Sequence, residues 1–141
     1  MTTMRVVLDT NSLLVSIPKD SKYRRIFDAI LNGEIRILLT NEILSEYSEI
    51  IERKMSPVVA INISGFLSQS VFVERVEVYY KWHLIHTDAD DNKFVDCAIN
   101  GNADYIVSDD RHFSKLKQID FPAVQVIKTA QFLEMLVNHL E

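Results

Sequence analysis

The sequence predicts an α/β fold, a three-layer α/β/α sandwich around a central parallel sheet. Short apolar runs rich in β-branched residues alternate with longer segments of helical periodicity, which is the order that parallel sheets require. These runs lack the alternation of half-exposed strands, so we expect helices on both faces of the sheet. The expected strands are Arg5–Leu8, Ile35–Leu39, Tyr105–Val107 and Val124–Ile127.

Five further segments have apolar residues at helical spacing. They cover residues 22–32, 41–54, 57–70, 91–101 and 129–140. A short extended segment is also expected within Val76–Tyr80 or Leu84–His86. Ligands of such sheets bind at the carboxyl ends of the strands, where the strand order reverses. Polar residues that directly follow a strand are therefore the first candidates for function.

The whole chain limits the classes of protein to consider. Its 141 residues are expected to form a single domain, 1–141, with no membrane partner, because no apolar run reaches the ~20 residues that span a bilayer. Cys97 is the only cysteine, which excludes an internal disulfide and favours the reducing cytoplasm. The net charge of −5 is weak evidence against a nucleic-acid partner, because one metal site of four acids would account for most of it.

Two candidate acids come from the first half of the chain. Asp9 directly follows the first strand and so lies at its carboxyl end; the alternative is a role in the turn that caps a following helix. Glu46 lies at the border of the apolar stripe of helix 41–54, about 40° from Ile50 on the helical wheel. The alternative for this glutamate is a border position from which the carboxylate reaches water.

The other candidate acids come from the second half. Asp91 lies in the first turn of helix 91–101, on its apolar face, where the helix dipole favours an anion; N-capping is the alternative. Asp109 and Asp110 follow the strand Tyr105–Val107 at its carboxyl end. An Asx turn could explain one of these two aspartates, but two in a row are harder to explain in this way.

All of these acids map to one edge of the predicted sheet. Carboxylates packed closely repel one another unless protons or a divalent cation neutralise them. Oxygen ligands without a group of histidines and cysteines suit Mg²⁺ or Mn²⁺ better than Zn²⁺. No ligand spacing is visible among the histidines His83, His86, His112 and His139. The sequence therefore predicts a site for one or two Mg²⁺ or Mn²⁺ ions, whose chemistry would be phosphoryl transfer.

Three stretches of the sequence resemble the PIN-domain family: "VVLDTNSLL", "TNEILSEYSEII" and "DADDNKFVDCAINGNADYIVSDDRHF". The closest branch is the one described as toxin components of toxin–antitoxin systems. The resemblance covers essentially the whole chain, and its third stretch is the most specific. It implies a nuclease that binds Mg²⁺ or Mn²⁺ through three or four acids and cuts single-stranded RNA.

By motif position, the resemblance assigns the catalytic and metal-binding acids to Asp9, Glu46, Asp91 and Asp110. It also implies roles for Asn11, which would help to position a water molecule, and for Ser108, which lies two residues before the last acid. Asp109 stands where many relatives have an uncharged residue, and Asp96 stands where some relatives have an acid. Both are therefore reserve ligands.

The function expected from the resemblance is a metal-dependent endoribonuclease, the toxin of a type II toxin–antitoxin pair. Hydrolysis of the RNA phosphodiester would leave a 5′-phosphate and a 3′-hydroxyl. The resemblance also implies a cognate antitoxin and a homodimer. Basic residues at the edge of the acidic site, such as Arg111 and Lys115, would guide the RNA.

Three other classes of function compete with this interpretation. A PIN-like module that only binds RNA or protein would be expected to have lost at least one of the acids. A phosphatase with an aspartyl nucleophile needs a second acid two residues later, where Asn11 stands. A phosphoacceptor receiver domain needs an acid pair at the end of the first strand, where only Asp9 stands. The retained acids favour the nuclease.

Overall fold

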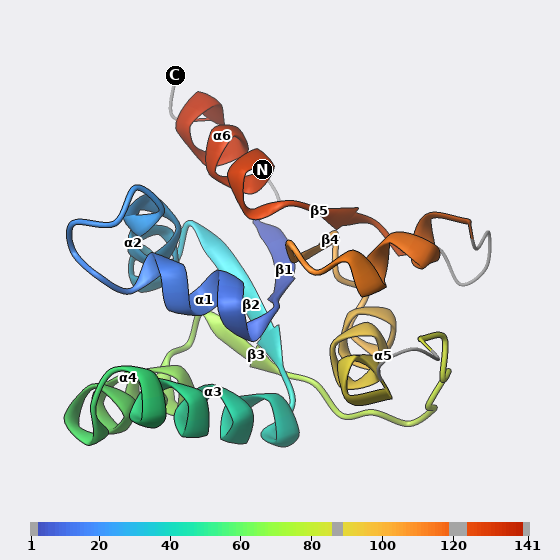
Figure 1. Ribbon diagram of the computed structural model, residues 1–141, viewed down its shortest axis with the longest axis horizontal. Helices are drawn as coiled ribbons and strands as arrows, with labels where there is room; N and C mark the ends of the chain where they lie inside the picture. The colour runs from blue at the N-terminus through green and yellow to red at the C-terminus, as the bar shows by residue number, and fades with distance from the viewer. Residues whose placement is uncertain (1–2, 86–88, 119–123, 140–141) are drawn as a thin grey trace.

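A five-stranded sheet in which all neighbouring strands run parallel forms the centre of the protein (Figure 1). The computed structural model describes residues 3–85, 89–118 and 124–139. The spatial order of the strands is β3-β2-β1-β4-β5, so the order reverses between β1 and β4. The strands are β1 (Met4–Leu8), β2 (Ile35–Leu39), β3 (Val73–Arg75), β4 (Tyr105–Val107) and β5 (Val126–Ile127).

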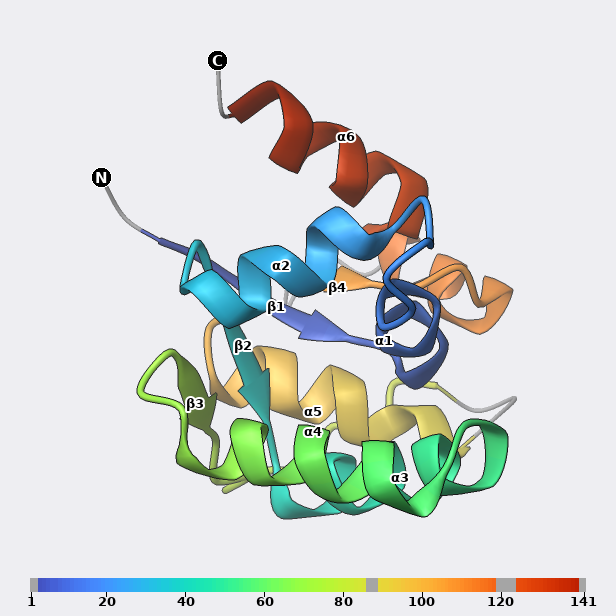
Figure 2. The same cartoon turned by 90° about the vertical axis from the view of Figure 1, so that its left-hand side faces the viewer.

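Helices cover both faces of this sheet. Figures 1 and 2 show β1 between α2 on one side and α5 on the other. Helix α6 packs against α2, whereas α3 and α4 pack against each other beside β2 and β3. The expected three-layer α/β/α sandwich is therefore confirmed. The helices are α1 (Thr10–Ser16), α2 (Arg24–Asn32), α3 (Asn41–Lys54), α4 (Pro57–Gln69), α5 (Asn92–Asn100) and α6 (Thr129–His139), with 3₁₀ helices η1 (Ala89–Asp91) and η2 (Arg111–Gln118).

Burial and capping explain why these residues form these elements. The middle strand β1 is fully buried from Val6 to Leu8, which is why its sequence is apolar without alternation. Thr40 begins α3, and its hydroxyl accepts the N–H of Ile43 at 3.1 Å. Ser56 caps α4 in the same way, followed by a proline in the first turn. No helix among the described residues is long and apolar enough to cross a membrane.

The structure differs from the sequence-based expectation in three elements. The extended segment is Val73–Arg75, which lies before the positions expected from the sequence, because these residues pair in register with β2. The last hydrogen bond of this pairing runs from the N–H of Val76 to the carbonyl oxygen of Leu39, at 2.8 Å. Part of the other expected segment, His86, lies outside the described residues. Helix α1 was not expected as a separate element, and the last strand is shorter than expected, at two residues.

Candidate metal centre

Asp9 lies at the end of β1, in the middle of the sheet. It stands at the N-cap position of α1 but makes no capping hydrogen bond with its side chain. The residue is 8% exposed, and the hydroxyl of Ser108 donates to its Oδ2 at 2.7 Å. Burial raises the pKa of Asp9, and the charges of Asp110 and Glu46 act in the same direction, against the hydrogen bonds that stabilise the carboxylate. The site therefore holds this negative charge at an energetic cost.

Glu46 of α3 points toward the sheet, as its place on the helical wheel predicted, and not simply to water. One carboxylate oxygen accepts the hydroxyl of Thr10, and the other lies 2.8 Å from the ammonium group of Lys93. The side chain of Lys93 is 6% exposed, and its ammonium group also contacts the carboxylate of Asp90 at 3.0 Å. The buried ammonium group of Lys93 thus lies between the carboxylates of Glu46 and Asp90, next to α3.

Asp91, Asp110 and His112 form the tightest group in the described part of the chain. The Nδ1 atom of His112 lies 3.2 Å from an oxygen of Asp91 and 3.2 Å from an oxygen of Asp110. One ligand atom from each of the three residues lies within 4.8 Å of the other two. Asp91 stands at the N-cap position of α5, yet its side chain makes no capping hydrogen bond. The carboxylate of Asp91 therefore does not cap α5, which was the alternative role for this residue.

His112 belongs to this group, although the four histidines show no ligand spacing in the sequence. The turn after β4 explains why: the N–H of Asp110 donates to the hydroxyl of Ser108 at 3.0 Å, and the N–H of His112 donates to the carboxylate of Asp110 at 2.9 Å. This turn directs the imidazole back toward Asp91, which lies 21 residues earlier in the chain. A histidine two residues after a candidate ligand is the one signal in the sequence that pointed to it.

Asp109 faces away from this group. Its two carboxylate oxygens accept the N–H and the hydroxyl of Thr129, both at 2.9 Å, and so join the end of β4 to the start of α6. The hydroxyl of Thr129 also lies 2.9 Å from that of Ser12. Of the two adjacent aspartates, Asp110 thus points toward Asp9 and Asp91, and Asp109 has a structural partner.

The remaining candidates lie outside the group. Asp96 is on α5, is 5% exposed, and accepts the N–H of Trp82 at 2.9 Å. Burial raises the pKa of this carboxyl group. Asn11 is exposed in the first turn of α1. The structure therefore groups Asp91, Asp110 and His112. Ser108 links Asp9 to Asp110, and Glu46 acts on Asp9 through its charge.

The sequence of the chain also matches a known protein family. A model described as the PIN domain matches residues 5–112, which include every candidate acid. The chain belongs to the PIN-domain family. None of the curated protein sequences matches it significantly.

Solved structures similar to this PIN domain include two VapBC structures and the PIN domain of RRP44. The chain is 19% identical to one from VapBC2 of Rickettsia felis bound to a promoter DNA fragment (TM-score 0.58, 89% of this chain and 98% of that chain). It is 16% identical to a chain of DNA-bound VapBC from Salmonella typhimurium (TM-score 0.54, 90% and 99%). It is 12% identical to the PIN domain of T. brucei RRP44 (TM-score 0.53, 98% and 83%). These similarities establish the fold of the chain.

Proposed function

We propose that this PIN domain is a metal-dependent endoribonuclease that hydrolyses phosphodiester bonds of single-stranded RNA. One observation carries the proposal: Asp91, Asp110 and His112 present ligand atoms within 4.8 Å of one another, and the charges of Asp110 and Glu46 act on the buried Asp9. Like charges held so closely are unfavourable unless a cation neutralises them. Family membership supports the same conclusion, because PIN domains are typically nucleases.

The residues present fit one or two divalent cations. Asp9, Asp91 and Asp110 would hold Mg²⁺ or Mn²⁺, which, when bound, polarises the phosphate and makes water a stronger nucleophile. Both oxygens of Glu46 already have partners, so we assign it a supporting role beside the ligands. His112 adds a nitrogen donor, which favours Mn²⁺ over Mg²⁺, because imidazole is a better ligand for transition metals.

Ser108 and Asn11 complete the proposed machinery. The hydroxyl of Ser108 donates to Asp9 and accepts the N–H of Asp110, so it holds two ligands in one geometry. Asn11 follows Asp9 by two residues and is exposed in the first turn of α1, and we assign it the orientation of the attacking water because of its motif position.

The surface next to β4 and β5 supports RNA as the substrate. A cavity of about 510 Å³ opens at the carboxyl ends of these strands, and its lining includes Asp110, Arg111 and Lys128. Two cations beside a candidate ligand suit an RNA backbone, whose phosphates would contact the basic side chains while one phosphate reaches the metal. The lining also includes Asp109, so the two basic side chains stand beside two acids and would act on the RNA backbone next to the metal-binding residues.

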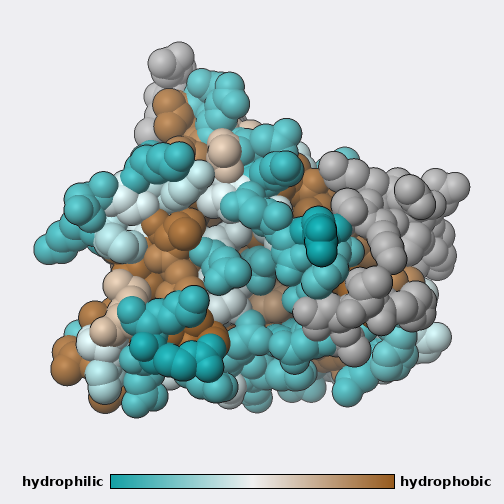
Figure 3. Space-filling view, in the orientation of Figure 1, coloured by the Kyte–Doolittle hydropathy of each residue, from teal (hydrophilic) through white to brown (hydrophobic). Residues whose placement is uncertain are grey.

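We further propose that the protein is a cytoplasmic, homodimeric toxin of a type II pair with a cognate antitoxin. The VapBC structures support this assignment, because both are toxin–antitoxin complexes with a PIN-domain toxin. Exposed apolar side chains provide a surface for a protein partner: Val15 on α1, Leu31 on α2, and Val58 and Ile61 on α4, the last two 66% and 70% exposed. Figure 3 shows hydrophobic surface between the regions of α2 and α4.

Cleavage of labelled single-stranded RNA by the purified protein tests the proposed activity. The reaction is run with Mg²⁺, with Mn²⁺ and with EDTA, for the wild type and for Asp9→Asn and Asp91→Asn. The matched control is Asp104→Asn, because Asp104 accepts the N–H of Arg5 at 2.8 Å at the opposite end of the sheet. We expect metal-dependent cutting that the first two substitutions abolish and the control retains.

Any bound antitoxin is first removed by unfolding and refolding the toxin. If the refolded protein binds Mn²⁺ but cuts none of a varied set of RNAs, the nuclease proposal is wrong. RNA binding without cutting would then identify a binding module. Cutting that persists in EDTA would contradict the metal-dependent mechanism.

A further inference from the structure

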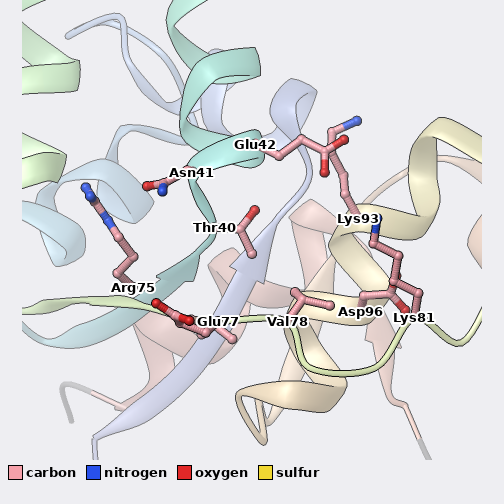
Figure 4. A pocket seen from close by; sticks show the side chains of 10 residues that line it. Thr40, Asn41, Glu42, Arg75, Glu77, Val78, Lys81, Lys93 and Asp96 are labelled. Carbon is pink, nitrogen blue, oxygen red and sulfur yellow. The ribbon is translucent and has the colours of Figure 1, made fainter.

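A second cavity lies on the other side of the candidate metal centre, at the carboxyl ends of β2 and β3 (Figure 4). Its volume is about 320 Å³, at the lower end of the ~300–1,000 Å³ range of small-molecule sites. Three parts of the chain form it: the start of α3 with Thr40, the segment after β3 with Val78 and Lys81, and α5 with Lys93 and Asp96.

The floor of this cavity is unusual because it is both buried and polar. Thr40, Lys93 and Asp96 line it and are 8%, 9% and 5% exposed, respectively. One oxygen of Asp96 accepts the N–H of Trp82, and the carboxylate lies near the charge of Lys81. Val76 and Val78 add apolar surface to the wall. A buried hydrogen-bond acceptor beside apolar side chains is typical of small-molecule sites and suits a heterocyclic ring.

Lys93 connects the cavity to the metal centre. Its side chain lines the cavity, and its ammonium group lies 2.8 Å from Glu46, whose other oxygen accepts the hydroxyl of Thr10. Thr10 directly follows Asp9. A nucleotide in the cavity would thus be linked to Asp9 through the Lys93–Glu46 ion pair and the hydrogen bond from Thr10 to Glu46.

We propose that this cavity binds one nucleobase of the RNA beside the cleaved bond and that Asp96 selects a base that presents amino or imino N–H groups to it. The inference rests on the proposed nuclease function. A carboxylate only accepts hydrogen bonds, so guanine fits best with its adjacent N1–H and N2–H groups. Uracil presents one N–H between two carbonyl groups and is disfavoured. Arg75 and Lys81, both exposed in the cavity wall, would contact the flanking phosphates.

Asp96→Asn tests the base selection directly. An amide oxygen can still accept the backbone N–H of Trp82, so the variant is expected to fold, but the second carboxylate oxygen becomes an NH₂ donor, which repels the N–H groups of guanine. Cleavage sites in a randomised RNA are sequenced for the wild type, for Asp96→Asn and for the control Asp104→Asn. We expect the wild type and the control to prefer guanine over uracil at one fixed position beside the cut. The preference should fall by about 5- to 100-fold in Asp96→Asn.

Binding of nucleoside monophosphates separates this proposal from the nuclease proposal. Binding is measured by isothermal titration calorimetry, because the contact of Trp82 to Asp96 is made by its backbone N–H and gives no optical signal of its own. In EDTA, GMP is expected to bind more tightly than UMP, and Asp96→Asn should remove the difference. Lys81→Gln should weaken both nucleotides and leave the difference in place.

The outcomes separate the two proposals. Metal-dependent cutting with no base preference, or with a preference that Asp96→Asn leaves unchanged, overturns the base-selecting cavity while the nuclease stands. GMP binding that depends on Asp96 in a protein that cuts no RNA supports the cavity as a nucleotide site and refutes the nuclease. If GMP and UMP bind equally and Asp96→Asn changes neither, the cavity does not select a base.

Discussion

The ammonium group of Lys93 lies 2.8 Å from a carboxylate oxygen of Glu46, and the two side chains are 6% and 24% exposed. Burial alone would lower the pKa of Lys93, but hydrogen bonds to Glu46 and Asp90 outweigh it, and the net pKa is raised. This ion pair joins α3 to the first turn of α5. The two helices that carry Glu46 and Asp91 are thus fixed to each other next to the candidate metal centre.

Substitution of either partner is expected to destabilise the protein. Lys93→Met leaves the carboxylate of Glu46 without its cation, and Glu46→Gln leaves the buried ammonium group with Asp90 alone. Each change should lower the free energy of unfolding. The loss in the double variant should be smaller than the sum of the losses in the two single variants, and the difference, the interaction energy of the pair, should be about 0.5–3 kcal/mol. Urea denaturation of the four proteins measures this. Strictly additive losses would show that the pair makes no contribution of its own.

Asp9→Asn is expected to stabilise the metal-free protein at neutral pH while abolishing cleavage. Burial raises the pKa of Asp9, so folding favours its protonated form. The stability from this group is complete below the ordinary aspartate pKa of about 3.9 and is lost as the pH rises through the raised pKa. The advantage of the variant over the wild type should therefore grow between about pH 4 and about pH 7.

Urea denaturation in EDTA across this pH range measures the difference. Added Mn²⁺ should reverse it, because the metal stabilises the wild type by binding only to its folded state and binds the variant weakly. If the variant is less stable than the wild type near neutral pH in EDTA, the charge of Asp9 does not destabilise the metal-free protein, and this prediction is wrong.

The two adjacent aspartates after β4 should have separable effects. Asp109→Ala removes the acceptor for the N–H and hydroxyl of Thr129 at the start of α6 and should cost about 1 kcal/mol of stability while cleavage is retained. Asp110→Asn should abolish cleavage with little loss of stability. Thermal unfolding and RNA cleavage of the two variants, measured side by side, test the assignment. The reverse pattern would make Asp109 the ligand.

Local patterns in the sequence predicted most of the sheet. The strands Ile35–Leu39 and Tyr105–Val107 coincide with the expected runs, because a strand buried on both faces needs a short apolar run and little else. β3 was misplaced, because three half-exposed residues carry little signal and their pairing with β2 is decided by register across the sheet. Helix α1 follows its strand without a loop, and only the capping alternative for Asp9 pointed to its start.

A candidate residue could be predicted from the sequence where its position within its own helix or strand determines the direction of its side chain. Glu46 could be selected by its place on the helical wheel, and Asp9 by its place after a strand. The contacts of His112 and Asp109 could not be predicted, because their partners, Asp91 and Thr129, are about twenty residues away in the sequence. The only local signal for His112 is its place two residues after Asp110. Such contacts depend on how turns return the chain to the sheet, and no local pattern encodes that. The catalytic roles of all these residues stay predictions until the variants are measured.

Cys97 is expected to be unreactive in the folded protein. The residue is fully buried, and burial raises the pKa of its thiol to about 12, with the charges of Glu74 and Asp96 acting in the same direction. The reactive thiolate is therefore absent near neutral pH. A thiol reagent such as a disulfide dye should label the native protein only as fast as it unfolds, and should label it at once in urea. Rapid labelling of the native wild type would contradict the burial.

The same shift predicts how stability depends on alkaline pH. Since the folded pKa is raised, the contribution of the thiol is complete below its ordinary pKa of about 8.5 and is lost as the pH rises toward 12. The free energy of unfolding should therefore fall more steeply above about pH 9 in the wild type than in Cys97→Ala, which has no group to ionise there. Equal slopes in the two proteins would mean that the thiol ionises as easily in the folded chain as in the unfolded one.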